Sequence, residues 1–299
     1  MIKVGGHKIG EVRQGNDLYT AIYLGAKKIY SVATIDFADQ AVKALCVSNW
    51  GGNVVEGEIT KGEAAAVTSL NGVFREKTQI TTFDELRFFT GLTSLSISGI
   101  DATAIGEFDA CTNLERITLP KASITNLAGA FHQCLKIRFL DLTPLSAGIN
   151  ISALTRYTSG SGLPTYDTEY LTEVKLPSGA YAGDWYQVFN RRKALQKIVI
   201  DGVADLSGLN GTTNDFSNAF NQCTSLTTIS GGIVGISQSI SFQHCPLTAD
   251  SAMVIINGLA DLTGQTGKTL TLSSTTKTAL TAAGIDYDTI ATAKNWQIS

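Results

Sequence analysis

The sequence predicts an α/β solenoid in which each coil contributes one short parallel strand. The first observation is a recurring Phe-x-x-Cys unit, which occurs at residues 108–111, 131–134, 220–223 and 242–245. The second is a set of apolar residues at fixed offsets after the unit, such as Leu114, Ile117 and Leu119 after Cys111. The third is a regular spacing of these sets along the chain, which is typical of stacked supersecondary units.

Six coils are recognisable from this pattern. Their first apolar positions are residues 92, 114, 137, 171, 195 and 226, so successive coils are 22, 23, 34, 24 and 31 residues apart. A basic period in the low twenties with two insertions is typical of a leucine-rich-repeat solenoid. We therefore predict one solenoid over residues 91–245, with stacked Phe and Cys side chains inside it.

Composition excludes several classes of protein. The formal net charge is -3 and only 16% of residues are charged, so no basic stripe is present to neutralise phosphates, and we expect no nucleic-acid partner. No apolar run approaches the roughly 18 residues of a membrane-spanning helix, so we expect no membrane insertion. Residues 1–5 lack the apolar stretch of a signal peptide.

The five cysteines favour a structural role. Four of them share the repeat position, and the fifth, Cys46, lies in a predicted helix. A small, weakly polar side chain repeated once per coil serves as a stacked core rung, so we expect reduced thiols. Adjacent coils could bring two such thiols near bonding distance, which leaves oxidation open.

The N-terminal 90 residues are predicted to form two units. Residues 6–35 contain a ten-residue repeat with glycine turns, and residues 1–35 are expected to form a three-stranded β-meander that docks on another surface. Residues 36–90 are expected to form a helix-loop-helix cap, with Asp36 as the first N-cap and capping boxes at Thr60–Glu63 and Thr82–Glu85. Such a cap covers the open edge of the first coil.

Residues 52–63 have the length of a calcium-binding loop, with Gly57 and Glu63 at the expected places. An EF-hand needs oxygen-bearing side chains at its first, third and fifth positions. Gly52 and Val54 occupy the first two of these positions and supply none. We therefore expect the shape of the motif without its metal.

Residues 246–299 are predicted to be helix-containing repeats that close the C-terminal end. Thr248 is expected to cap one helix, a second is expected at 275–283 and a third from Asp286. Strands are expected at Leu270–Ser273 and Trp296–Ile298.

An exposed sheet face is expected because alternate residues of a strand point to opposite sides. The predicted outward pairs are Ser94 and Ser96, Arg116 and Thr118, Phe139 and Asp141, Glu173 and Lys175, Lys197 and Val199, and Thr228 and Ser230. From these we select as candidate partner-binding residues Arg116, Thr118, Glu173, Lys175 and Lys197.

An aromatic cluster lies in the larger insertion and the coil after it. Its members are Tyr157, Tyr166, Tyr170, Tyr181, Trp185 and Tyr186. Rigid rings with a polar edge are favoured where binding needs contact area, so a partner-binding role is one hypothesis, led by Trp185 and Tyr186 with Tyr157, Tyr166 and Tyr170 supporting them. The alternative is that these rings pack the longer loop onto the coil.

Catalytic chemistry is not indicated. The three histidines lie in separate parts of the chain, and no phosphate loop, nucleophile elbow or zinc spacing is present. We therefore expect no enzyme, no cofactor and no metal, and we assign no catalytic residues.

The run Phe108–Leu119 resembles the BspA-like leucine-rich repeats of bacterial surface proteins, especially those of Bacteroides-type gut bacteria. The stretch Glu58–Leu95 is similar to the segment that commonly precedes these repeats. The N-terminal meander and the closure over Leu270–Ile298 also resemble proteins encoded in Bacteroides phages and prophages. The resemblance implies adhesion and partner binding, and it supplies no catalytic residues.

The leading functional hypothesis is a non-enzymatic binding or adhesion protein that presents its repeats to a protein or glycan on a cell surface. The alternative is a structural or host-recognition protein of a phage tail, in which the meander docks on the tail. The expected location is correspondingly the cell surface or a phage particle. The oligomeric state is left open.

Overall fold

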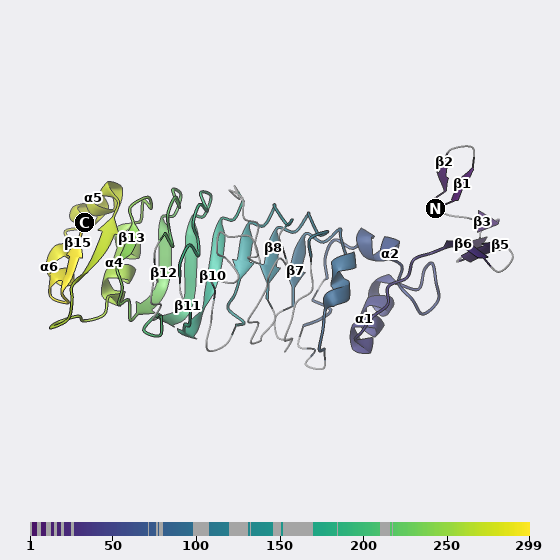
Figure 1. Ribbon diagram of the computed structural model, residues 1–299, viewed down its shortest axis with the longest axis horizontal. Coiled ribbons are helices and arrows are strands. Elements are labelled where there is room, and N and C mark those ends of the chain that lie inside the picture. The colour runs from purple at the N-terminus through teal and green to yellow at the C-terminus, as the bar shows by residue number, and fades with distance from the viewer. Residues whose placement is uncertain are drawn as a thin grey trace.

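The computed structural model describes residues 32–70, 72–75, 77, 80–97, 108–119, 131, 133–145, 151, 170–183, 185–209, 216 and 218–299, and the backbone of six short strands within residues 2–31. Figure 1 shows an elongated stack of coils, with α1 and α2 near one end and α5 and α6 at the other.

The central sheet has six parallel strands, one from each predicted coil. They are β7 (Ser94–Ser96), β8 (Arg116–Thr118), β9 (Phe139–Asp141), β10 (Glu173–Ala180), β11 (Lys197–Asp205) and β12 (Thr228–Val234). Neighbours in the sheet follow chain order from β7 to β12. The predicted fold class, a leucine-rich-repeat solenoid with a parallel sheet, is therefore confirmed.

The repeated Phe and Cys side chains form the inside of the coils. The rings of Phe108 and Phe131 stack with centroids 5.5 Å apart, and those of Phe220 and Phe242 stack at 4.4 Å. All five cysteines are free and buried. Each repeat thiol lies against backbone carbonyls of the preceding coil; Cys223 Sγ, for example, donates a hydrogen bond to the Phe189 carbonyl at 2.9 Å.

Strands β10, β11 and β12 run further than the apolar triplets predict. Each continues past a glycine with positive φ, at Gly179, Gly202 and Gly231. At Gly231 a Cβ atom would collide with the Ile200 carbonyl of the neighbouring strand, so only glycine fits there. The strand pairing shifts register at these bends.

The N-terminal cap contains α1 (Gln40–Trp50), α2 (Lys61–Ala66) and the 3₁₀-helix η1 (Asp84–Phe88). The capping box of Thr60–Glu63 is present at the start of α2. Two other predicted caps are wrong. Asp39, not Asp36, caps α1, accepting from the Ala41 and Val42 amides.

The predicted capping box at Thr82–Glu85 does not form. Phe83 is the N-cap residue of η1 and makes no side-chain cap bond. Glu85 is buried, and its Oε1 accepts a hydrogen bond from the Ala38 amide at 3.1 Å. A contact with the segment before α1 has therefore replaced the local cap.

The C-terminal end agrees closely with its prediction. It contains α4 (Ala249–Gly258), β14 (Lys268–Leu272), α5 (Ser274–Ala282), α6 (Tyr287–Thr292) and β15 (Trp296–Ile298). Strand β13 (Ile240–Phe242), which lies before these elements, was not predicted. The strands β13, β14 and β15 form a second parallel sheet. Thr248, Ser273 and Asp286 cap the three helices with their side chains.

The strands within residues 2–31 differ from the predicted three-stranded meander. They are β1 (Ile2–Val4), β2 (His7–Ile9), β3 (Arg13–Gln14), β4 (Asp17–Leu18), β5 (Ala21–Leu24) and β6 (Lys27–Ser31). They form three separate antiparallel pairs, β1 with β2, β3 with β4 and β5 with β6. The ten-residue repeat thus corresponds to a hairpin, not to a single strand of one sheet.

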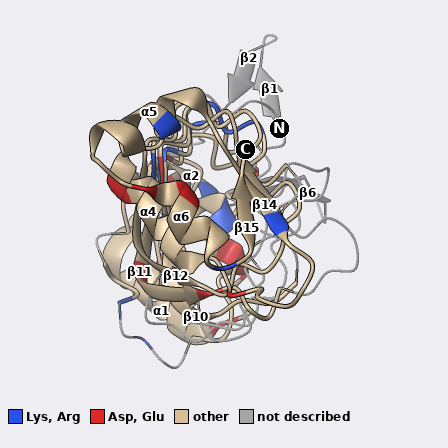
Figure 2. Ribbon diagram, turned by 90° about the vertical axis from the view of Figure 1, so that its left-hand side faces the viewer, with Lys and Arg blue, Asp and Glu red and all other residues tan. Residues whose placement is uncertain are grey.

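Charge is mixed over the molecule. Viewed from the C-terminal end, Lys and Arg are interspersed with Asp and Glu (Figure 2). In the part of the chain that the structure describes, no helix has the length and apolar character needed to cross a bilayer.

Candidate partner-binding surface

The outward face of strands β7 to β12 is the candidate site. The apolar residue at the centre of each short strand is buried, so its two neighbours point outward; Ile117, for example, is buried between Arg116 and Thr118. Strand pairing aligns these neighbours into two rows. The first row is Ser94, Arg116, Phe139, Glu173, Lys197 and Thr228, and the second is Ser96, Thr118, Asp141, Lys175, Val199 and Ser230.

Phe139 lies in the middle of this face and is half-buried. The Arg116 guanidinium carbon lies 4.1 Å from the centroid of its ring, and Lys175 Nζ lies 5.4 Å from it. A cation over an exposed aromatic face is stabilised by about 0.5–1 kcal/mol. The result is a ring with a positive group from the strand on either side.

An ion pair continues the first row. Lys197 Nζ lies 3.6 Å from Glu173 Oε1, and Glu173 is aligned with Phe139 across the sheet. Exposed pairs of this kind contribute little to stability. Their effect here is to hold both side chains over the sheet, beside the aromatic centre.

Asp141 is engaged by its own turn. Its Oδ1 accepts hydrogen bonds from the Thr143 amide at 3.0 Å and from the Thr143 hydroxyl at 2.7 Å. This carboxylate is therefore partly satisfied within the chain. The other charged groups around Phe139 are Arg116, Lys175 and the Glu173–Lys197 pair.

The five sheet residues selected as candidates lie on the outward face, where the alternation along the strands predicted them. Arg116, Thr118, Glu173, Lys175 and Lys197 lie on one face, in adjacent strands. Phe139 was predicted to lie on this face but is not among the selected residues. The signal was available, because an aromatic residue at an outward strand position between two cationic positions is unusual for a solvated surface.

The aromatic cluster is divided by the structure. Tyr157 and Tyr166 lie outside the described residues. Tyr170 is 42% exposed and lies three residues before β10, with the Arg138 guanidinium carbon 5.8 Å from its ring centroid. Tyr186 is half-buried.

Trp185 is only 3% exposed, so it packs inside the coil and cannot contact a partner directly. Its indole makes edge contacts with Tyr181, Phe189, Phe216 and Phe220. The buried Tyr181 donates its hydroxyl to the Pro177 carbonyl at 2.7 Å. The leading residue of the aromatic hypothesis is therefore corrected to a packing role.

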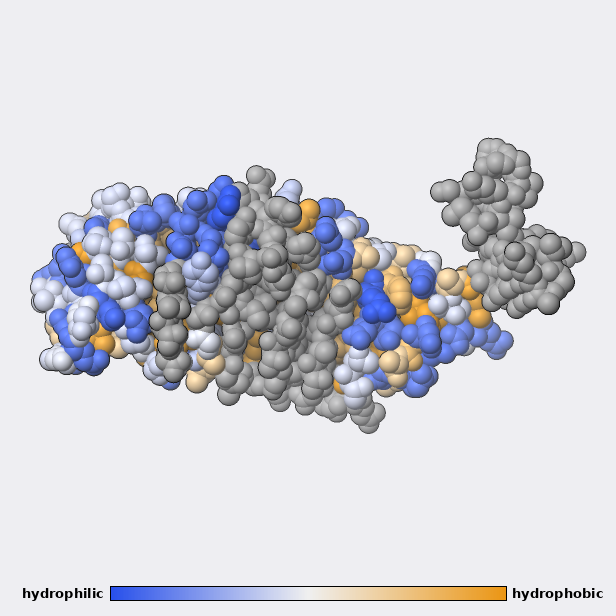
Figure 3. Space-filling view, viewed as in Figure 1, coloured by the Kyte–Doolittle hydropathy of each residue, from blue (hydrophilic) through white to orange (hydrophobic). Residues whose placement is uncertain are grey.

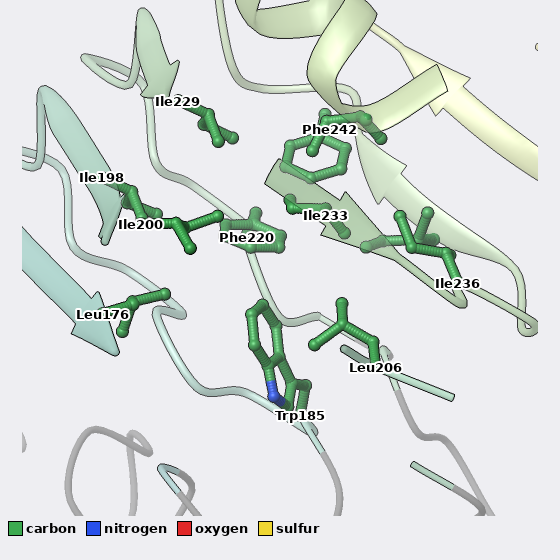
Figure 4. A pocket seen from close by; sticks show the side chains of 12 residues that line it. Leu176, Trp185, Ile198, Ile200, Leu206, Phe220, Ile229, Ile233, Ile236 and Phe242 are labelled. Atoms are coloured by element: carbon green, nitrogen blue, oxygen red, sulfur yellow. The ribbon is translucent and has the colours of Figure 1, made fainter. Parts of the chain in front are cut away.

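The space around Trp185 is not a ligand site. Trp185 and surrounding isoleucine, leucine and phenylalanine side chains enclose it (Figure 4). Its volume is about 10 Å³ and its lining is wholly apolar. A cavity of this size is at the lower limit for one water molecule, and it offers a water no polar partners.

The buried thiols are poor nucleophiles at neutral pH. Burial raises the pKa of Cys111 to about 11 and the pKa of Cys223 to about 12. Burial also raises the pKa of Cys134 and that of Cys245. Across the described residues, no group of three or more His, Cys, Asp or Glu is placed to hold a metal ion.

Comparisons with known proteins are sparse. No protein-family model matches the chain, and no curated protein matches its sequence. Among solved structures, the crystal structure of an internalin from Listeria monocytogenes is similar, with 16% identity and a TM-score of 0.26. That match covers 88% of this chain and 91% of the internalin chain. The fold class therefore rests on the strand pairing described above.

Proposed function

We propose that this chain is a non-enzymatic binding protein that engages a protein partner through the outward face of β7 to β12. The observation that carries the proposal is Phe139, half-buried at the centre of the face and flanked by Arg116 and Lys175. Aromatic and arginine side chains dominate the binding energy of protein interfaces when they lie near the centre. The partner would offer an apolar contact to the ring and an acidic group to the two cations.

A protein is favoured over a glycan at this face because the two rows spread across six strands. The rows contain both signs of charge, with Lys197 and Glu173 paired beside the aromatic centre. Such a spread of charges supports specificity and orientation over a broad contact. The Phe-x-x-Cys motif supports kinship with BspA-like surface proteins, and hence display at a cell surface.

The test compares capture of surface proteins from candidate host cells by the wild-type chain and two variants. Phe139→Ala removes the central ring, whereas Thr228→Ala changes the same row at its far end. We expect Phe139→Ala to reduce capture of a specific partner about tenfold or more, as for a central anchor, and Thr228→Ala to leave it unchanged. Equal capture by all three chains would rule out this face.

A second candidate function is a component of a phage tail. It is favoured by the three hairpins within residues 2–31, since an isolated two-stranded sheet is marginally stable and gains from docking on a larger assembly. Expression of the gene with an epitope tag, followed by electron microscopy of labelled particles from induced cells, tests this function. Label on tails supports it, and label confined to cell surfaces contradicts it.

A further inference from the structure

A surface hollow of about 460 Å³ lies at the N-terminal end of the solenoid. It is formed by α2, by η1 and the turn after it, and by the Phe-x-x-Cys unit of the next coil. The residues used below are Lys61 from α2, Arg87 and Phe88 from η1, Thr90, and Asp109. None of them belongs to the outward face of the sheet. Over this end of the molecule, hydrophobic and hydrophilic surfaces lie side by side (Figure 3).

Contacts around the hollow hold the elements that form it in place. The capping box at Thr60–Glu63 fixes the first residue of α2, which is Lys61. Gly91 packs so closely on the end of α2 that a Cβ atom there would collide with the Ala65 carbonyl. Cys111 Sγ lies 3.7 Å from the Arg87 carbonyl, which ties η1 to the following coil.

Two cations meet one aromatic ring in this hollow. Lys61 Nζ lies 4.4 Å from the centroid of the Phe88 ring, and the Arg87 guanidinium carbon lies 5.1 Å from it. Both side chains are exposed and Phe88 is half-buried. The ion pairs found among the described residues involve neither Lys61 nor Arg87. Within the described residues, neither cation is therefore held in an ion pair.

A carboxylate and a hydroxyl also line the hollow, from Asp109 and Thr90. Asp109 is half-buried, and its Oδ1 accepts one hydrogen bond, from the Gln133 amide at 3.3 Å. A carboxylate accepts up to about four hydrogen bonds, so Asp109 retains capacity for hydroxyl donors. Thr90 adds a hydroxyl that donates and accepts. The hollow therefore combines two cations, one carboxylate, one hydroxyl and an aromatic ring.

We propose that this hollow binds an acidic saccharide, a sugar that carries one carboxylate and several hydroxyls. Lys61 and Arg87 would take the sugar carboxylate, Asp109 and Thr90 would take hydroxyls, and Phe88 would contact the apolar C–H surface of the ring. Two positive charges against one negative charge favour a ligand with a single anionic group. An acidic peptide is disfavoured, because its successive carboxylates would be repelled by Asp109 and would leave Phe88 without a matching surface.

The test measures binding of galacturonic acid, galactose and a tri-aspartate peptide to the full chain, by ligand-observed NMR and calorimetry. Galacturonic acid and galactose differ mainly by the carboxylate. We expect galacturonic acid to bind about tenfold or more tightly than galactose, which corresponds to about 1.4 kcal/mol. Its affinity should fall as sodium chloride is raised, because salt screens exposed charges.

Variants identify the site. The double change Lys61→Gln and Arg87→Gln should weaken galacturonic acid binding about tenfold, and Phe88→Leu should weaken it further. Lys277→Gln, in α5 at the other end of the molecule, is the matched control and should have no effect. Melting temperatures verify folding, and since Lys61 and Arg87 are exposed, the double variant keeps the test valid if Phe88→Leu is unstable. Equal binding of galactose, preference for the peptide, no saturation by any probe, or an unaffected double variant would each overturn the proposal.

Discussion

At the scale of single residues, the repeat cysteine serves both packing and hydrogen bonding. Cys223 is fully buried, and its thiol donates to the carbonyl of Phe189, one coil earlier, at 2.9 Å. We predict that Cys223→Ala lowers the free energy of unfolding by about 1–3 kcal/mol, because it removes buried volume and the thiol donor together. Cys223→Ser keeps a donor of similar size and separates the two contributions. Urea unfolding measures both, and an alanine variant as stable as wild type would contradict this role.

The same burial makes the thiols inert in the folded protein. The pKa of Cys111 is raised to about 11 by burial, so it is protonated at pH 8. We predict that a thiol reagent labels native protein slowly at pH 8 and labels five thiols after denaturation. Rapid native labelling would contradict burial, and fewer than five denatured thiols would indicate disulfides.

The raised thiol pKa also sets a direction for stability against pH. An unfolded thiol ionises near pH 9, whereas the folded Cys111 ionises at about 11. Between these values the folded state holds more protons, so its stability decreases as pH rises. We expect the melting temperature to fall from pH 9 to pH 11, and to fall less when Cys111 is replaced by Ala. Equal slopes for the two proteins would remove Cys111 as a cause.

At the scale of elements, Lys294 connects the turn after α6 to the C-terminal end of α4. Its Nζ donates to the carbonyls of Asn257 and Leu259 at 2.9 and 3.0 Å, at the end of α4. A cation at a helix C-terminus also interacts favourably with the helix dipole. We predict that Lys294→Met lowers the free energy of unfolding by about 1–3 kcal/mol. Lys277→Met on α5 is the control, and equal effects of the two changes in urea unfolding would contradict a specific lock.

Glu63 organises the loop of residues 52–63 through hydrogen bonds. Glu63 Oε2 accepts from the Thr60 amide and the Thr60 hydroxyl, both at 2.8 Å, and Oε1 accepts from the Asn53 amide at 3.1 Å. The acid that a calcium loop would need at its last position is thus engaged by the protein. We predict no rise in melting temperature on adding millimolar calcium. A rise of several degrees that a chelator reverses would contradict this.

Elements that depend on neighbouring residues in the sequence could be predicted, whereas elements that depend on distant contacts could not. The caps at Thr60 and Thr248 depend on residues within one helical turn, and both were predicted correctly. The cap at Asp39 was missed because the same carboxylate also accepts from the Thr81 amide and hydroxyl, a contact 42 residues away. Strand length in β10 to β12 was missed for a similar reason, since the bend at Gly231 is imposed by the adjacent coil.

The sequence predicted which residues lie on the candidate face, but not that they meet at Phe139. Alternation along the strands placed Arg116 and Lys175 correctly on the outward face, but their meeting at Phe139 depends on the register between coils. The repeat pattern also gave no indication of a buried charged residue. Arg192 stands three residues after Phe189, where other coils have Cys, and it is only 1% exposed. The spacing of apolar residues locates this core position in each coil, but it does not show which type of side chain occupies it.

At the scale of the whole molecule, the hairpins and the solenoid are expected to be separable. The solenoid side begins with the hydrogen bonds from the Lys61 amide to Ala33 and from the Ile35 amide to Ile59. We predict that deleting residues 2–31 leaves the melting temperature unchanged within about 2 °C, since the strands of this segment pair with one another two by two. A large loss of stability in calorimetry would mean that the hairpins pack on the solenoid.

Each repeat thiol reaches back to the coil before it, as from Cys134 to Phe108 and from Cys245 to Phe220. Coils joined in this way make similar contacts with the coil before and the coil after, so the stack could be lengthened by duplication of a coil. Neighbouring strands lie about 4.8 Å apart, so each added copy would lengthen the molecule by about that distance. The number of repeats therefore sets the distance between the N-terminal and C-terminal ends of the solenoid.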